Sequence, residues 1–195
     1  MNFLAHLFLS GDDDELKVGN FIGDSVKGRD LSAYPARVQD GIKMHRSIDR
    51  YTDTHHIVMN SKVRLRPKYH KYAPVIIDMF YDHFLASLWG DYSKITLEQF
   101  IQESHYLLNS KIDIMPERTQ FMLPYMIKGN WLLGYRELTG LDRSLTGMSK
   151  RSRFKSNMEH AVADLERDYE KYKQEFQAFF PDIIGFVTTS PNKCQ

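Results

Sequence analysis

The sequence contains very little cysteine. Its single thiol, Cys194, stands next to the end of the 195 residues. One cysteine excludes a disulfide within the chain, a zinc site built from several thiolates, and a cysteine pair for redox chemistry. A reducing compartment is therefore expected, with the cytoplasm as the default.

The chain also lacks an excess of charge and a long apolar run. It carries 26 Lys and Arg residues against 25 Asp and Glu residues, so a general attraction to nucleic acid is not expected. The opening MNFLAHLFLSG is apolar, but it has no basic flank and GDDDE follows it, which favours a buried first helix over a signal peptide. No later run approaches the ~18 to 20 residues of a membrane span, so no membrane partner is expected.

Several familiar catalytic motifs are missing as well. The sequence has no Walker loop, no HExxH zinc motif, no GxSxG nucleophile elbow and no dinucleotide fingerprint. The enzyme classes that depend on these motifs are therefore disfavoured.

Hydrophobic residues recur with a helical period, and no segment alternates convincingly with a period of two. The length suits one domain with a sizeable core, over residues 1–195. The pattern predicts an all-α fold, a compact bundle of about seven to nine helices. The expected helices include an opening helix, 16–28, 35–53, a helix ended by Pro67, 73–89, 96–109, two segments that stop at Gly140, and a long last helix from Met158. Helix 73–89 is apolar on almost every side and is expected to be the central buried helix, and an aromatic stripe on the last helix is expected to pack in the core.

Two of these helices carry ligand-type side chains where core residues are expected. In helix 35–53 an apolar stripe continues into His45 and Asp49, and in helix 73–89 Asp78 and Asp82 interrupt a hydrophobic seam. Ionised carboxylates in such a seam are costly unless a cation or a donor network compensates them. We therefore expect a bound metal ion, with His83 as a further candidate.

The first two helices offer more candidates. His6 stands one turn after Asn2 in the opening helix, and is either a ligand or a core histidine bonded to a backbone carbonyl. Asp24 shares a helix face with Asn20, and glycines at 19 and 23 cost stability unless another element or a ligand approaches the backbone there. Asp53 extends the series of His45 and Asp49, or is a solvated residue at the helix end.

Imidazole and carboxylate ligands without thiolate favour Mn²⁺, Mg²⁺, Fe²⁺ or Zn²⁺. Such an ion lowers the pKa of bound water towards ~7, and phosphoester hydrolysis is a natural use of the resulting hydroxide. Arg46 is the first candidate for balancing charge on the phosphoryl oxygens. Weaker candidates are Lys27, Arg29 and Arg151.

Two segments are strongly basic. The first, KVRLRPKYHK over 62–71, contains Arg64 and Arg66, and the second runs from Lys150 to Lys155. Each segment is either a solvated connection or a docking patch for an acidic partner. Arg151 or Arg153 is also placed to hold a phosphate.

Five segments resemble the acyl carrier protein phosphodiesterase family in the same order over nearly the full length: NFLAHL, GNFIGDSVKG, GIKMHRSIDRYTD, APVIIDMFYDHFL and LTGMSKRSR. The resemblance implies cleavage of the phosphodiester between acyl carrier protein and its prosthetic group, releasing 4'-phosphopantetheine and the apo carrier. It also implies a fold distantly similar to HD-domain metal phosphohydrolases, Mn²⁺ as the usual ion, and metal residues His6, Asp24, His45, Asp49, Asp78, Asp82 and His83.

Here the adjacent pair runs Asp82 then His83, the reverse of the simple HD pattern, so either could face the ion.

Acyl carrier proteins are acidic helical domains, and either basic segment could steer one to the site. Two other functions stay open: hydrolysis of a nucleotide or other small phosphodiester, and a nonenzymatic helical binding module. The oligomeric state does not follow from the sequence.

Overall fold

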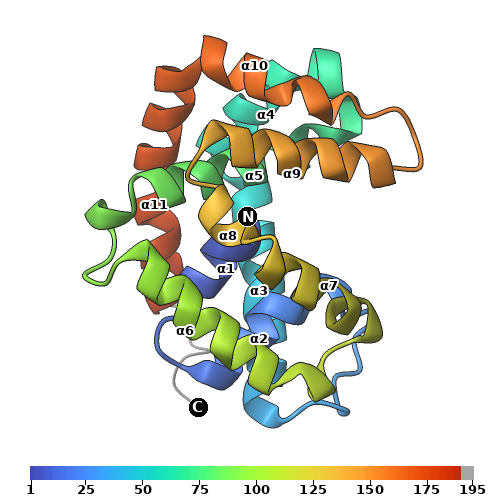
Figure 1. Ribbon diagram of the computed structural model, residues 1–195. Coiled ribbons are helices and arrows are strands. Elements are labelled where there is room, and N and C mark those ends of the chain that lie inside the picture. The colour runs from blue at the N-terminus through green and yellow to red at the C-terminus, as the bar shows by residue number, and fades with distance from the viewer. Residues whose placement is uncertain (190–195) are drawn as a thin grey trace.

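The computed structural model describes residues 1–189, and Cys194 lies outside this range. The described chain contains helices and connections without any strand, which confirms the all-α class. This range contains eleven α-helices, more than the sequence predicted, and Figure 1 shows their arrangement. They are α1 (Phe3–Leu9), α2 (Asp14–Ile22), α3 (Ala36–Thr54), α4 (His56–Tyr69), α5 (Ala73–Ser87), α6 (Leu97–Ser110), α7 (Glu117–Lys128), α8 (Trp131–Gly134), α9 (Leu138–Arg151), α10 (Ala161–Arg167) and α11 (Tyr169–Thr189).

Helix α5 is the central helix, as its sequence predicted. It contacts α1, α4, α9 and α11, and Figure 1 shows it passing between them. Its apolar side chains are almost all buried, and so are Asp82 and His83. The aromatic stripe of α11 packs against it, for example Tyr172 on Phe80 with ring centroids 5.3 Å apart. None of the helices described is long and apolar enough to cross a membrane.

Helices α2 and α3 pack with their backbones in contact. A Cβ atom at Gly19 would lie 2.1 Å from the carbonyl oxygen of Val38, and one at Gly41 would lie 2.3 Å from that of Leu16. Only glycine fits at such a crossing. The close approach explains why α2 tolerates a glycine in its interior, and it brings the faces that bear Asn20 and His45 together.

Four expected helix boundaries were wrong. The helix expected over 16–28 ends at Ile22. Pro67 lies inside α4, which continues to Tyr69, and the chain turns instead at His70. Gly140 lies inside α9, where a Cβ atom would meet the carbonyl oxygen of Gly134 at 2.1 Å, so this glycine serves close packing on α8. The last helix is divided in two, because the path breaks at Asp168 between α10 and α11.

Candidate metal centre

Three side chains from two helices bring ligand atoms together. The ligand atoms of His6, on α1, and of His45 and Asp49, on α3, lie within 4.8 Å of one another. Both Nε2 atoms point at one carboxylate: His6 Nε2 is 3.2 Å from Asp49 Oδ1, and His45 Nε2 is 3.2 Å from Asp49 Oδ2. Asp24, in the short helix η1 (Gly23–Ser25) after α2, adds Oδ1 at 3.2 Å from His45 Nε2. Among the residues predicted as ligands, the structure gathers these four.

The second nitrogen of each ring is held by Asn20. His45 Nδ1 is 2.8 Å from the backbone oxygen of Asn20, and a carbonyl only accepts, so Nδ1 carries the hydrogen. His6 Nδ1 is 2.7 Å from Asn20 Oδ1, and the Asn20 amide nitrogen donates to the His6 carbonyl and to Ser10 Oγ. This orientation of the amide makes His6 Nδ1 a donor too. In its neutral form, each ring therefore carries its lone pair on Nε2.

A lone pair on each Nε2 thus faces a carboxylate, which is repulsive unless a positive charge lies between them. His45 Nε2 is buried and has no hydrogen-bond partner of acceptable geometry, although two carboxylates lie near it. Histidines whose other nitrogen is held by a carbonyl or amide oxygen are typical metal ligands. Two imidazole nitrogens and two carboxylates therefore fit a divalent cation, and no thiolate competes for the site.

The titration behaviour of the metal-free site reflects the same arrangement. Burial disfavours charge on His45, but the carboxylates of Asp24 and Asp49, each 3.2 Å from Nε2, outweigh it and raise its pKa to about 9. Burial, together with the charge of His45, lowers the pKa of His6 to about 4. Burial opposes ionisation of Asp49, yet both histidines keep the pKa of its carboxyl well below its usual range. The proton on His45 Nε2 thus lies between two carboxylates, at a position where these groups would also favour a metal cation.

Asp78 lies beside this group without joining it directly. The α-amino group of Met1 is 3.1 Å from Asp78 Oδ1 and 3.5 Å from Asp49 Oδ1, and so links the two carboxylates. Burial raises the pKa of the Asp78 carboxyl, although the α-amino charge opposes the shift. Asp78 is thus adjacent to the centre.

The structure gives Asp82 and His83 contacts other than the predicted metal ligation. Both oxygens of Asp82 accept from backbone N–H groups of the chain start: Leu4 N at 2.8 Å, and Asn2 N and Ala5 N at 3.3 Å each. Asp82 therefore caps α1 and holds the helix that carries His6. His83 bonds through Nδ1 to the carbonyl of Tyr135 at 2.8 Å and through Nε2 to the Tyr169 hydroxyl at 3.0 Å, so both of its nitrogens are engaged.

Gly23 and Arg46 shape the surroundings of His45. A Cβ atom at Gly23 would lie 2.3 Å from Cγ of the His45 ring, so glycine makes room for the imidazole. Arg46 donates through Nη2 to the carbonyls of Val26 at 3.2 Å and Gly28 at 2.8 Å. The guanidinium predicted to meet a phosphate therefore holds the loop after η1. That loop carries Lys27 and Arg29, both exposed.

Three residues of the expected ligand and docking sets form internal ion pairs. Asp53 accepts from Lys62 Nζ at 2.6 Å, and Lys62 is almost fully buried rather than part of a surface patch. Arg64 pairs with Glu175 and lies over the Tyr172 ring at 4.5 Å, which ties α4 to α11. Arg66 and Arg151 are exposed, as a docking role requires.

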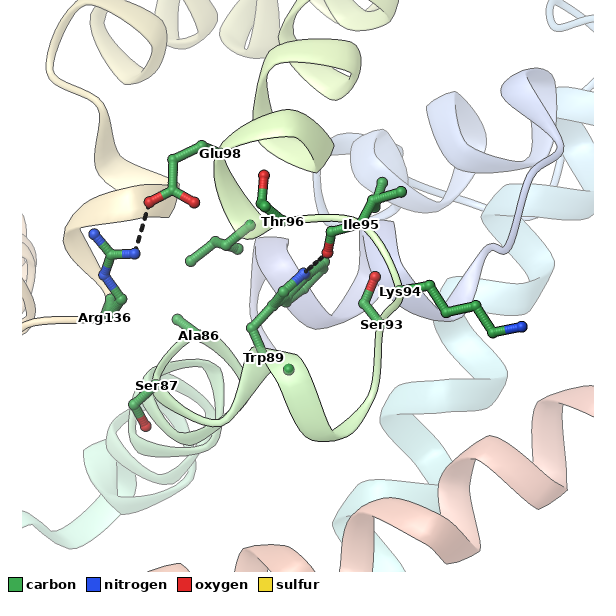
Figure 2. A pocket seen from close by; sticks show the side chains of 11 residues that line it. Ala86, Ser87, Trp89, Ser93, Lys94, Ile95, Thr96, Glu98 and Arg136 are labelled. Carbon is green, nitrogen blue, oxygen red and sulfur yellow. Dashed lines mark hydrogen bonds and ion pairs between the residues drawn. The ribbon is translucent and has the colours of Figure 1, made fainter.

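A separate hollow of about 390 Å³ lies between the end of α5 and the start of α6. Figure 2 shows Trp89 at its floor, with Nε1 bonded to the carbonyl of Ile95, and the Arg136–Glu98 ion pair at its edge. No predicted metal ligand lines it. The hollow is therefore distinct from the candidate centre.

Asn20 and Ser10 are the site residues whose roles the sequence did not reveal. Asn20 was noted only as sharing a face with Asp24, and Ser10 was not considered. A polar amide at a fully buried position in the middle of α2 is the signal that identifies Asn20.

Comparison with known proteins confirms the family resemblance found in the sequence. The model of the family described as "Acyl carrier protein phosphodiesterase" matches residues 1–183. Proteins named acyl carrier protein phosphodiesterase from Enterobacter sp. (strain 638) and Photorhabdus laumondii are 35% and 32% identical; the matches cover 94% of this chain in both cases, and 96% and 93% of the relatives. No solved structure matches, so the likeness to HD-domain proteins stays a prediction. The chain belongs to the acyl carrier protein phosphodiesterase family.

Proposed function

We propose that the protein hydrolyses the phosphodiester that joins an acyl carrier protein to its prosthetic group. Water adds to phosphorus, the bond from phosphorus to the carrier's oxygen breaks, and that oxygen gains a proton. The products are 4'-phosphopantetheine and the apo carrier. The family supports the substrate, and the unpartnered His45 Nε2 between two carboxylates is the observation that supports a hydrolytic metal site.

The proposed ligands are His6, His45, Asp49 and Asp24, with Asp78 beside them. Mn²⁺ is the first candidate, and Mg²⁺, Fe²⁺ or Zn²⁺ also suit these donors. Such an ion, when bound, supplies a Lewis acid for the phosphoryl group and activates water near neutral pH. Asn20 keeps both imidazoles in the tautomer that ligation requires.

Asp24 has the most open position of the four residues. Its side chain is 74% exposed, whereas that of Asp49 is 37% exposed and those of the histidines are almost covered. Because an approaching phosphodiester meets this carboxylate first, we assign Asp24 to the substrate side of the centre. There it accepts the proton from the attacking water.

The loop after η1 supplies the positive charge that a phosphodiester needs beside these carboxylates. Arg46 holds the loop by its carbonyls, and Lys27 and Arg29 extend from it into solvent. We assign Lys27 and Arg29 to the phosphoryl oxygens, where cations stabilise developing charge. Arg46 acts through the loop as a positioning residue.

The test is to incubate the purified protein and Mn²⁺ with holo acyl carrier protein and to follow the carrier by mass spectrometry. Loss of the phosphopantetheine group is expected, and chelation should stop it. If the holo carrier stays intact with every one of the four metals, the proposal is wrong. A parallel panel of nucleotides and small phosphodiesters identifies a metal phosphohydrolase with another substrate, and the absence of any metal after gentle purification would favour a binding module.

A further inference from the structure

The two basic segments of the sequence meet in space around one exposed ring. Phe154 is 57% exposed, and its ring centroid lies 4.0 Å from Lys71 Nζ and 5.5 Å from Arg153 Cζ. The Tyr72 hydroxyl donates to the Phe154 carbonyl at 3.3 Å and accepts from Ser152 Oγ at 2.6 Å. The sequence offered these segments as alternative docking patches, and the structure joins them.

Irregular backbone holds each segment in place. His70, between α4 and Lys71, has φ 50° and ψ −121°, a region that residues with a side chain rarely adopt. Asn157, with φ 58°, returns the chain after Phe154. Figure 1 shows the connection from α9 to α10 projecting at the right edge of the molecule. Strained backbone of this kind persists where the surrounding structure requires it and is concentrated at functional sites.

The cations around Phe154 are available to a partner. We define the basic face as Phe154 with Lys71, Lys150, Arg151, Arg153 and Lys155. All five cations are exposed, and within residues 1–189 none forms an ion pair with a carboxylate. In the same region Lys62, Arg64 and Lys68 do form such pairs, so only part of the first basic segment is available to a partner.

We propose that the basic face docks the acidic surface of the carrier protein, an inference that rests on the proposed function. Five unpaired cations match acidic side chains, and an exposed aromatic ring among them supplies the apolar anchor that interface hot spots require. The near-neutral charge of the whole chain makes this local concentration the specific signal. Nucleic acid, the other polyanion, is a separate outcome of the test.

The position of the face suits a small domain as the partner. Helix α3 carries Asp49 shortly before its end, and α4 continues from there towards the basic face. The 14 residues of α4 span about 21 Å. A domain of 100 residues has a radius of gyration of about 13 Å, so one carrier can cover both places. The scissile bond lies at the attachment point on the carrier. The carrier's own surface must therefore reach the centre while another part of it is held.

The test compares two triple variants of equal charge change. One carries K71E, K150E and K155E, and its control carries K111E, R118E and K128E on exposed positions of the α6–α7 region. For the face variant we expect KM for the holo carrier and Kd for the labelled apo carrier to rise at least about tenfold. Both variants should keep kcat, and both should hydrolyse bis(4-nitrophenyl) phosphate at the wild-type rate, since this substrate needs no docking.

A second variant separates the ring from the charge. Phe154→Ala should weaken apo-carrier binding about fivefold at both low and high salt, because it removes an apolar contact. Equal weakening of carrier binding by the two triple variants would overturn the proposal. It would also be overturned if the face variant lost binding to a DNA oligonucleotide but bound the carrier as the wild type does. Failure of the wild type to release phosphopantetheine would refute the proposed function. The docking proposal is tested separately, by the Kd for the apo carrier.

Discussion

The imidazole rings of His6 and His45 are stacked, with centroids 4.0 Å apart and planes inclined by 19°. The stack comes from two helices, and Asn20 on a third helix holds both rings by their Nδ1 atoms. Two protonated rings at this separation would repel each other, which agrees with a pKa of about 4 for His6 beside a charged His45. A cation shared by both Nε2 atoms removes this conflict.

Removal of one ligand should abolish metal binding and activity together. For His45→Ala we expect bound manganese to be lost and activity to fall by more than about 100-fold, the upper range for loss of an outer-shell partner. Metal content by elemental analysis and release of phosphopantetheine measure the two effects. His160→Ala, an exposed histidine, is the control and should change neither. A fully active His45→Ala enzyme would remove this residue from the centre.

Loss of Asn20 should weaken metal binding without removing a ligand. Asn20→Ala frees both tautomers of His6, so we expect a 10- to 100-fold loss in metal affinity, measured by competition with a chelator. The control is Ser104→Ala, because Ser104 is also buried but its hydroxyl has no hydrogen-bond partner. Unchanged affinity in Asn20→Ala would show that the amide does not orient the His6 ring.

Gly23→Ala should displace the His45 ring while leaving the fold intact. The new Cβ atom would lie 2.3 Å from Cγ of that ring and 2.5 Å from Cβ of His45, which no rotamer change moves, so the ring must shift together with the α3 backbone beside it. We expect weaker metal binding with far-ultraviolet circular dichroism close to wild type. Gly185→Ala is the matched control, because no atom lies within 4 Å of the added methyl group there. Wild-type metal affinity in Gly23→Ala would mean that the ring tolerates the shift.

Asp82→Ala should act on stability rather than on ligation. The carboxylate accepts three backbone N–H groups at the start of α1, and unpaired buried donors are costly. We expect a loss of about 2–4 kcal/mol in the free energy of unfolding, measured by urea titration. Asp113→Ala, at an exposed position, should stay within about 0.5 kcal/mol. A variant with wild-type stability that fails to bind metal would instead return Asp82 to the ligand set.

Metal affinity should rise with pH up to about 9. Below that value His45 in the metal-free protein carries a proton that the ion must displace, whereas His6, with a pKa of about 4, is already neutral. Apparent affinity should therefore fall about tenfold for each pH unit below 9, with one proton released per ion. Calorimetry in buffers of different ionisation enthalpy counts that proton. Release of two protons, or of none, would contradict the assignment.

The same shift predicts how the metal-free fold responds to pH. The folded state holds the His45 proton more tightly than the unfolded chain, whose histidine pKa is near 6.5. This contribution to stability is complete below pH 6.5 and is lost as pH rises to about 9. Thermal melts across this range measure the loss, which should be smaller in His45→Gln because only the Met1 α-amino group, whose pKa is raised by Asp78 and Asp49 against the effect of burial, still contributes.

Helical periodicity was sufficient to predict the fold class and the central position of α5. It could not predict that α9 continues through Gly140, because this glycine allows close packing on α8 and local sequence does not reveal that contact. It also did not predict the break at Asp168. Pro67 was taken as a helix terminator, yet the turn is made by His70, which carries no turn signal of its own.

The candidate centre was predicted in part. His45 and Asp49 lie one turn apart on one helix face, so spacing alone brings them together. Asp82 satisfied the same pattern for a different reason, because a buried carboxylate can be compensated by backbone N–H groups as well as by a metal. Periodicity shows that a polar group is buried but does not show which partner it meets.

The contact between Asp82 and the start of α1 also has a consequence for the cell. One carboxylate tethers the opening residues, and those residues place His6 at the candidate centre, so a bound ion and the first helix would stabilise each other. Leu4, Ala5 and Leu7 of that helix are fully buried, so loss of the ion would lower the stability of the whole core rather than release one helix. A shortage of divalent cations would then shorten the lifetime of the folded protein in the presence of proteases.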